Sequence, residues 1–577
     1  MESDSSPPLG LSPPPDISPP PEFTPLHESF IPEAKAFPPI EYALSVKSSA
    51  SAELFSDQLS DLNLELFSKG LTWIVDTLTG PTRTSSTRLA IIKNEDELDA
   101  LSGGGDEDSP ELRAMAACRA YKILYGKNAI TPDHPSYKEA MQTNWSKTCW
   151  LPTSCYLRPH GTLDVAIAIK IITQFQSRFG IRGGGHNVNP GFGSLCGSGI
   201  LIDLREMDFV DISHYRNTVS VGPGATWGKV YDTLEKYDLT VAGGRVGSVG
   251  VAGLILGGGM SHFSNHWGLA CDNVKNFEVA LADTSVVQAN ETQNPDLFKA
   301  LKGGGANFGI ITKIDLYTSP EFKIWYTENI YSPDDAEKVI KACVEVQKAM
   351  EFDDRIGYNL FLSADAVAVS LVYRGWTNPP PIFKVFDDIT PVKTPVPPKN
   401  MTQASLARAL DHGGNISCET GALTIKVDAD FYMEIYRLLQ EVDRRTNGEH
   451  TFICAIQPIG SAVAHKGKER GGNSLNIPEE NQSWLGIRAE WSDESDRGPE
   501  QAKICDFIES VESKAKERGV FLGFQFMNDA SHRQSPLEGY GAESLSALRQ
   551  ASIKFDPTGL FQRLQNSGFL LSKTNEE

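Results

Sequence analysis

Apolar residues after Gly161 recur with the spacing of a helix. They are Val165, Ala168, Ile169, Ile172, Phe175 and Phe179. This spacing predicts a helix that is capped at Thr162, carries Asp164 in its first turn and ends at Gly180. Short apolar runs bounded by Gly, Asp and Ser then predict strands. The predicted strands cover residues 181–182, 200–204, 219–221, 277–281 and 310–316.

After Pro320 the pattern changes to longer helices and alternating strands. Ser332 is suited to cap a helix because a proline and two aspartates follow it, and apolar spacing continues this helix to Val346. Residues 358–362 and 366–373 alternate between apolar and polar positions and predict a hairpin. The remaining predicted elements are a helix at 431–442, strands near 451–458 and 484–491, and a helix at 498–517. This order predicts an α+β domain with an antiparallel sheet.

Composition places the chain among globular proteins and limits its partners. The chain has 577 residues, of which 40% are hydrophobic, and a net charge of −21. An acidic surface repels phosphate backbones, so we expect no nucleic-acid partner. The longest apolar stretch, residues 249–260, is interrupted by glycines and is shorter than the roughly 18 residues that span a bilayer. We therefore expect no membrane partner.

The N-terminal 110 residues differ in texture from the rest. Residues 1–40 are rich in proline, which predicts a disordered tail, and residues 41–110 form an extension that ends in a polar linker at 102–110. The first residues have neither the basic nor the apolar region of a signal peptide, so a cytoplasmic location is favoured. Nine cysteines without a C-x-x-C pair argue against a zinc ribbon or a dense disulfide framework.

Glycines form clusters at 183–185, 191–193, 222–224, 243–259 and 303–309. Such clusters allow close backbone approach and suit an extended anionic ligand held by backbone N–H groups. A Rossmann site requires a strand, a glycine turn and then a helix. The residues after Gly185 end in Pro190-Gly191 and cannot begin a helix, so the Rossmann interpretation is not favoured.

Seven segments, in this order and spacing, resemble the berberine-bridge-enzyme-like oxidoreductases. They are RGGGHN at 182–187 with Gly191, VGPGATW at 221–227, VGVAG at 249–253, LGGG at 256–259, GLACDN at 268–273, GGGANFGIIT at 303–312 and KFDPTGLF at 554–561. The resemblance covers about residues 115–571. It implies a vanillyl-alcohol-oxidase-type fold, with a PCMH-type FAD-binding domain made of 111–321 and a returning segment 521–577. Residues 322–520 would form the substrate domain.

The resemblance also implies a set of cofactor-binding residues. His186 would be bonded covalently to the 8α-methyl group of FAD, and residues 182–187 would wrap its pyrophosphate with backbone donors and the Arg182 charge. The implied set is Arg182, Gly183, Gly184, Gly185, His186, Asn187, Gly191, Val246, Gly250, Val251, Gly253, Asp272, Asn273 and Ile310. Val246 stands where many members carry a second, cysteine link to the flavin, so only a single link is expected.

A second departure concerns the catalytic base. Many members have a Y-x-N-Y motif near the C-terminus, whereas this chain reads Phe526-Met527-Asn528-Asp529. Burial can raise the pKa of a carboxyl group from about 3.9 toward neutrality, which would suit Asp529 as the base. An exposed aspartate in a turn is the alternative, and Tyr540 and His412 are substitute candidates. His262 and His266 lack a nearby carboxylate in sequence, so no metal site is expected.

We therefore expect an FAD-dependent oxidase that removes two electrons from a small organic molecule. Hydride would pass to flavin N5, and dioxygen would reoxidise the flavin. The substrate is expected to be compact, and a secondary metabolite is favoured over an oligosaccharide. Two alternatives stay open. One is a dehydrogenase or oxidative cyclase with another acceptor, and the other is a non-catalytic flavin-binding interaction protein.

Overall fold

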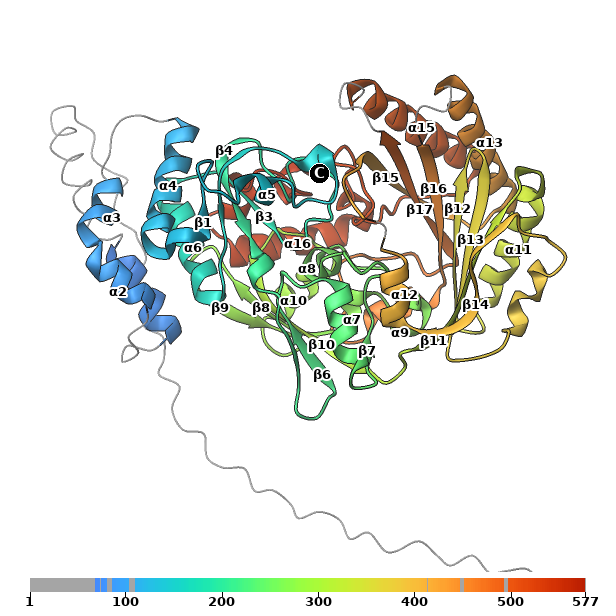
Figure 1. Cartoon of the computed structure of the whole chain (residues 1–577), viewed down its shortest axis with the longest axis horizontal. Helices are drawn as coiled ribbons and strands as arrows, with labels where there is room; N and C mark the ends of the chain where they lie inside the picture. Colours follow the sequence, from blue (N-terminus) through green and yellow to red (C-terminus); the bar gives the residue numbers. More distant parts are fainter. Residues whose placement is uncertain are drawn as a thin grey trace, which may run out of the picture. The chain divides into compact units, whose positions relative to one another are not determined.

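Three β-sheets organise the part of the chain that the computed structural model describes (Figure 1). That part comprises residues 68–72, 74–79, 86–102, 109–411, 413–446, 451–491 and 497–575. The predicted proline-rich tail at 1–40 and the candidate His412 lie outside these ranges. Helices accompany each sheet, so the predicted α+β class is confirmed.

The first sheet has four strands in the order β1-β2-β4-β3. They are β1 (Ala129–Ile130), β2 (Thr153–Leu157), β3 (Phe179–Arg182) and β4 (Gly197–Asp203). Strands β2, β4 and β3 run parallel, so their carboxyl ends share one edge. The helices of this region are α2 (Ser86–Lys93), α3 (Glu95–Ser102), α4 (Pro110–Tyr125), α5 (Tyr137–Met141) and α6 (Thr162–Phe175).

The helix predicted after Gly161 is present but shorter than expected. Gly161 occupies the N-cap position, whereas Thr162 is the first helical residue and donates a hydrogen bond to Glu278 at 2.8 Å. The helix ends because Gln176 adopts a left-handed conformation with φ of 47°. Phe179, predicted as helical, lies instead in β3 and pairs with β4. An apolar side chain at this position fits either a helix or a strand, and the pairing with β4 places Phe179 in a strand.

The second sheet has six strands and is antiparallel. Its strands are β5 (Val210–Ile212), β6 (Thr218–Val221), β7 (Thr240–Val241), β8 (Val274–Ala280), β9 (Val286–Ala289) and β10 (Ile310–Ser319). The order is β5-β6-β10-β8-β9, with β7 pairing the far end of β10. The helices between these strands are α7 (Trp227–Glu235), α8 (Val251–Leu256), α9 (Ser264–Trp267) and α10 (Pro295–Leu301). The strands predicted at 219–221, 277–281 and 310–316 are confirmed within one to three residues.

The third sheet has eight antiparallel strands in the order β14-β11-β13-β12-β16-β17-β15-β18. Its strands are β11 (Lys323–Tyr331), β12 (Ile356–Ser363), β13 (Ala366–Arg374), β14 (Lys393–Thr402), β15 (Ser417–Lys426), β16 (Thr451–Ile459), β17 (Gln482–Trp491) and β18 (Phe521–Leu522). The predicted hairpin is the β12–β13 pair. The antiparallel sheet predicted after Pro320 is therefore confirmed.

Helices cover one face of this sheet and leave the other face for the glycine-rich segments. Figure 1 shows α11 (Ala336–Ala349), α13 (Ala429–Thr446) and α15 (Arg497–Arg518) together on one face, and their apolar side chains share a core with the strands. The opposite face approaches the glycine stretch, because a Cβ at Gly357 would lie 2.4 Å from the carbonyl oxygen of His262. Two shorter helices, α12 (Gln403–Ala409) and α14 (Ala462–Lys468), complete this region.

The C-terminal segment packs against the first two sheets. Helix α16 (Ala542–Phe555) contacts α10, and α17 (Leu560–Arg563) follows it. The backbone of Phe179 in β3 accepts a hydrogen bond from Asn566 at 2.7 Å and donates one to Leu564 at 3.0 Å. Residues 564–566 thus pair with β3 at the edge of the four-stranded sheet. None of the helices in the described ranges is long and apolar enough to cross a bilayer.

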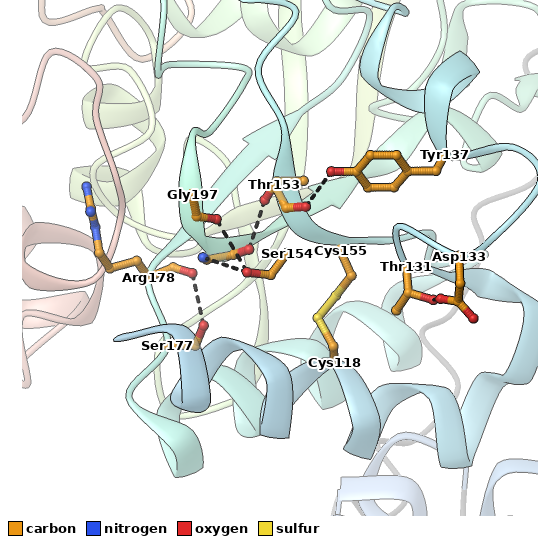
Figure 2. The surroundings of a disulfide bond; sticks show 11 residues. Cys118, Thr131, Asp133, Tyr137, Thr153, Ser154, Cys155, Ser177, Arg178 and Gly197 are labelled. Carbon is orange, nitrogen blue, oxygen red and sulfur yellow. Dashed lines mark hydrogen bonds between the residues drawn. A yellow bond between two sulfur atoms is a disulfide. The ribbon is translucent and has the colours of Figure 1, made fainter. Parts of the chain in front are cut away.

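One disulfide bond joins Cys118 of α4 to Cys155 of β2 (Figure 2). Both side chains are buried, and the bond links α4 to the central residue of β2. The sequence did not identify this pair. It closes a loop with a sequence separation of 37 residues.

Removing this disulfide should destabilise the protein, because the bond limits the freedom of the unfolded chain. A loop of this length corresponds to about 4 kcal/mol in the chain-entropy model. We expect a reducing agent to lower the melting temperature of the wild type. The double variant Cys118→Ala, Cys155→Ala should melt at the lower temperature with and without reductant, whereas Cys196→Ala, at an exposed free cysteine, should behave like the wild type. A wild-type melting temperature that is insensitive to reductant would contradict the prediction.

Candidate functional site

The glycine loop after β3 lies against the backbone of two other segments. A Cβ at Gly184 would lie 2.5 Å from the Cα of Gly250, and one at Gly183 would lie 2.8 Å from the carbonyl oxygen of Pro223. Gly185 has φ of 72°, in the left-handed region that favours glycine. These three positions therefore require glycine for geometric reasons, and the loop is fixed against the start of α8.

Arg182, the last residue of β3, is held by a buried carboxylate. Its Nη2 lies 2.8 Å from Oδ2 of Asp203, and the Arg182 side chain is only 1% exposed. Arg205 and Arg158 also contact this carboxylate, at 3.0 and 3.4 Å. Burial acts to raise the pKa of Asp203, but Arg182 and Arg205 outweigh it and hold the pKa below its usual value. The sequence analysis gave the Arg182 charge to a pyrophosphate, whereas the structure pairs that charge with Asp203.

His186 follows the glycines and presents a neutral imidazole. Its ring stacks on Trp145, with centroids 5.1 Å apart and planes 27° from parallel. Its Nε2 is buried without a hydrogen-bond partner in the structure. Burial disfavours the charged form and lowers the pKa of His186 to about 4, although Asp411 acts in the opposite direction. An unpaired, uncharged ring nitrogen is thus present where the resemblance expects the flavin attachment.

The glycine stretch from 243 to 259 is shaped by close packing. Gly244 lies against the Trp227 ring, since a Cβ there would be 2.6 Å from the ring. Val246, two residues later, is half-buried, and its side chain offers no nucleophile. Val251 is fully buried, whereas Gly253 is exposed, and a Cβ there would meet no atom within 4 Å. The structure therefore has free space beside Gly253 on α8.

Asn528, the one motif residue kept from Y-x-N-Y, holds this stretch in place. It donates a hydrogen bond to the carbonyl of Gly253 at 3.3 Å and accepts one from the N–H of Gly259 at 3.1 Å. Gly191 is held in a similar way, because Asn566 donates to its carbonyl at 2.9 Å. Both asparagines fix loop backbone with their side-chain amides.

The side chains of four other residues in the predicted cofactor set form contacts within the protein. Asp272 accepts hydrogen bonds from the Leu269 backbone and from Asn473, both at 2.8 Å. Asn273 donates to two backbone carbonyls in the turn before it. Ile310 begins β10 in the core, and the exposed Asn187 accepts a hydrogen bond from the next-but-one backbone N–H. The side chains of Asp272, Asn273 and Ile310 are thus held by contacts within the protein, whereas Asn187 remains exposed.

Asp529 lies in a polar cluster on the inner face of the eight-stranded sheet. Its Oδ2 accepts a hydrogen bond from Nε2 of Gln457 in β16 at 2.8 Å. Gln457 in turn accepts from Arg245, and Arg245 also donates to Oδ1 of Asn359 in β12. Burial raises the pKa of Asp529, while the Gln457 hydrogen bond and the nearby charge of Arg245 oppose the rise. The alternative of a freely exposed turn aspartate does not describe this side chain.

Sequence reasoning missed Arg245, Gln457 and Asn359. Gln457 and Asn359 lie on strands where a polar side chain is unremarkable in sequence. Arg245 could have been noticed in the sequence, because an arginine within a run of glycines and apolar residues is unusual. In the structure, burial lowers the pKa of Arg245. His262 lies in the same region, and it lines a cavity of about 10 Å³ together with Arg245 and Asn359. Burial lowers the pKa of His262 to about 3.

The substitute base candidate Tyr540 does not join this cluster, and neither does His266, which was considered only as a metal ligand. Tyr540 is fully buried, and its hydroxyl donates to the carbonyl of Gly303 at 3.0 Å. Burial raises the pKa of that hydroxyl far above its ordinary value, so the structure argues against Tyr540 as a base. His266 contacts Asp354 at 2.7 Å and Glu321 at 3.2 Å, carboxylates that the sequence did not place near it. Within the described ranges no three His, Cys, Asp or Glu residues are grouped as metal ligands.

Replacing Asp203 should destabilise the protein strongly. Asp203→Asn removes the charge that compensates Arg182, Arg158 and Arg205, and loss of one partner of a buried ion pair typically costs about 3–5 kcal/mol. Urea unfolding should show this loss. Asp208→Asn is the matched control, since Asp208 pairs with Lys229 on the surface and such pairs contribute about 0–1 kcal/mol. Equal unfolding free energies for the two variants would refute the assigned role of Asp203.

Comparison with known proteins identifies the cofactor class. Residues 153–290 match a family model described as an FAD binding domain. An FAD-dependent monooxygenase of the fungus Arthrobotrys oligospora is 33% identical over 459 residues, which cover 79% of this chain and 89% of the relative.

Solved structures share the fold. The berberine-bridge-enzyme-like protein 1 of Physcomitrella patens superposes with a TM-score of 0.66 at 18% identity, over 78% of this chain and 99% of that one. A glucooligosaccharide oxidase of Acremonium strictum, which carries a 6-S-cysteinyl, 8α-N1-histidyl FAD, gives a TM-score of 0.64 at 18% identity over 78% and 97% of the chains. The chain therefore belongs to a family of FAD-linked oxidoreductases that includes this FAD-dependent monooxygenase, and it shares the PCMH-type fold of the berberine-bridge-enzyme-like flavoproteins.

Proposed function

We propose that the protein is an oxidase that removes two electrons from a small organic substrate, with dioxygen as the acceptor. The observation that carries this proposal is the half-buried carboxylate of Asp529, which is held by Gln457 and has a raised pKa. FAD, when bound, supplies the redox chemistry by taking hydride at N5 and giving the electrons to dioxygen. The protein supplies binding, orientation and the base.

The residues of the site fit FAD. The glycine loop at 183–185 offers backbone N–H groups at a turn without side chains, which suits a pyrophosphate. The unpartnered ring nitrogen of His186 and the free space at Gly253 are further features that a bound dinucleotide would use. The excess of arginines around Asp203 adds positive charge at the edge where the parallel strands end, the usual place for a ligand in such sheets.

His186 is proposed to carry the flavin through a single covalent bond. A histidine attacks as the neutral imidazole, and the lowered pKa of His186 keeps the ring neutral over the physiological range. The histidyl link of the Acremonium strictum oxidase supports this assignment. That protein also has a cysteinyl link, whereas Val246 provides no thiol at the corresponding motif position.

Replacing His186 should make the flavin dissociable. We expect the wild-type protein to keep its yellow colour in the pellet after acid precipitation, and His186→Ala to release FAD into the supernatant. His214→Ala, at an exposed histidine, is the control and should retain its flavin. If the wild type releases all of its flavin in acid, the covalent link is wrong.

Asp529 is proposed to act as the base that takes a proton from a hydroxyl or amine of the substrate. A carboxyl group with an ordinary pKa near 3.9 is a weak base at neutral pH. Burial beside Gly486 of the sheet raises its pKa, which brings it closer to the range that favours proton transfer. Its Oδ1 is left for the substrate, since Gln457 occupies Oδ2.

Asp529→Asn should slow flavin reduction about 10²-fold or more, the usual contribution of a positioned base. The amide still accepts the Gln457 hydrogen bond, so flavin content and folding should be unchanged. Anaerobic stopped-flow measurement of flavin reduction by the substrate tests this, with Asp365→Asn in the exposed β12–β13 turn as the control. Reduction of the variant at the wild-type rate would exclude Asp529 as the base.

The substrate class is proposed from chemistry and relatives together. An FAD-dependent monooxygenase of Arthrobotrys oligospora is similar to this chain over 79% of its length, and the missing cysteine link separates the chain from the bicovalent glucooligosaccharide oxidase. A compact secondary metabolite is therefore favoured over an oligosaccharide. Anaerobic bleaching of the flavin spectrum across a metabolite library would identify the substrate. Flavin that no compound bleaches would favour a non-catalytic flavin-binding protein.

Monooxygenation is the second candidate function, because the curated relative bears that name. The two reactions differ in the fate of dioxygen. An oxidase releases hydrogen peroxide in equal amount to product, whereas a monooxygenase transfers one oxygen atom to the product. Turnover under ¹⁸O₂ separates them, and turnover with neither peroxide nor labelled product would favour a dehydrogenase or an oxidative cyclase.

A further inference from the structure

We propose that Arg245 and Gln457 are positioning residues that fix where Asp529 can be protonated. Together they form a one-way chain of hydrogen-bond donors that ends on Oδ2 of Asp529, so that Oδ1 alone accepts the substrate proton. This inference rests on the proposed role of Asp529 as the base. Its test below is independent of substrate turnover.

Arg245 determines the direction of this chain of hydrogen bonds. A guanidinium group has only donors, so each group that it contacts must present an acceptor. Arg245 donates to Oδ1 of Asn359 and to Oε1 of Gln457. The orientation of the Gln457 amide is therefore set by Arg245, and its NH₂ group points to Asp529. An isolated glutamine could flip its amide, but Arg245 prevents the flip.

The second step concerns the carboxylate. Nε2 of Gln457 donates to Oδ2 of Asp529 over 2.8 Å. A proton on Oδ2 would meet the N–H of Gln457 instead of a lone pair, so that oxygen stays an acceptor. The proton that leaves the substrate hydroxyl or amine must then bind to Oδ1, and the carboxylate becomes a neutral acid. The neighbouring carbon loses a hydride, which bound FAD would accept to complete the two-electron oxidation.

The third step concerns charge. The charged groups that bear on the Asp529 carboxylate are Arg245 and, from β17, Arg488. His262 lines the same cavity as Arg245, and its low pKa keeps it neutral. Arg488 is also paired with Glu490 at 2.8 Å, whereas Arg245 contacts only amide oxygens among the ion pairs and hydrogen bonds described. Arg245 therefore supports the ionised form of Asp529 through Gln457.

The chain is tested by the titration of Asp529 in the flavin-loaded protein. Carbodiimide coupling to glycine ethyl ester labels carboxyl groups in their protonated form, and peptide mass spectrometry reports the labelling of Asp529 against pH. Gln457→Leu removes the donor to Oδ2 and should raise the midpoint by about one pH unit or more. Gln457→Glu adds a second carboxylate beside Asp529 and should raise the midpoint further.

A double-mutant cycle separates a chain from a simple charge effect. Arg245→Met should raise the midpoint in the wild-type background and have a much smaller effect in the Gln457→Leu background. Arg488→Met is the matched control, because it removes a nearby charge that is outside the chain, and its effect should add to that of Gln457→Leu. Retained flavin and far-UV circular dichroism establish that each variant is folded.

Two results would overturn the proposal. One is an unchanged Asp529 midpoint in both Gln457 variants, and the other is additivity of Arg245→Met with Gln457→Leu. If Arg245→Met does not fold, the comparison of Gln457→Leu with Gln457→Glu decides, since equal midpoints in those two variants would also refute the chain. Normal flavin reduction by Asp529→Asn would refute the base assignment instead, while leaving the titration result intact.

Discussion

The contact between the backbones of Gly184 and Gly250 is the constraint on which the site depends. A side chain at either position would overlap the other segment, with a Cβ at Gly184 only 2.5 Å from the Cα of Gly250. The contact joins the loop after the four-stranded sheet to the start of α8, next to the six-stranded sheet. His186 follows within two residues and is thereby held against Trp145. The packing of the two segments and the proposed attachment of the cofactor thus depend on the same glycines.

Burial of polar groups on both sides of this contact determines the chemistry. Asp203 stays ionised because arginines surround it, and it anchors the strand from which the glycine loop begins. His186 is neutral because burial lowers its pKa more than the nearby Asp411 carboxylate raises it. Asp529 lies between these cases, since burial raises its pKa while Gln457 and Arg245 oppose the rise. One protein interior thus produces a fixed charge, a neutral imidazole and a carboxyl group with a raised pKa by varying the partners of three side chains.

The sequence predicted the fold better than the site. Apolar alternation located the β12–β13 hairpin, and glycine spacing identified the family. The local sequence pattern could not predict where α6 ends. The end depends on the left-handed conformation of Gln176 and on the pairing of Phe179 with β4, and both arise from tertiary structure. For the same reason the sequence assigned the Arg182 charge to a phosphate, since Asp203 is 21 positions away and contacts it only across the sheet. Arg245, Gln457 and Asp529 come together from a loop, a strand and the C-terminal segment, which no spacing rule connects.

We propose that His186 carries the flavin and that Asp529 is the base of the same site. A crystal structure of the flavin-loaded protein tests this most directly. The account predicts continuous electron density from the His186 ring to the 8α carbon, none from Val246, and Oδ1 of Asp529 facing the space above N5. A flavin bound elsewhere, or an Asp529 carboxylate shielded from the flavin by the sheet, would contradict it.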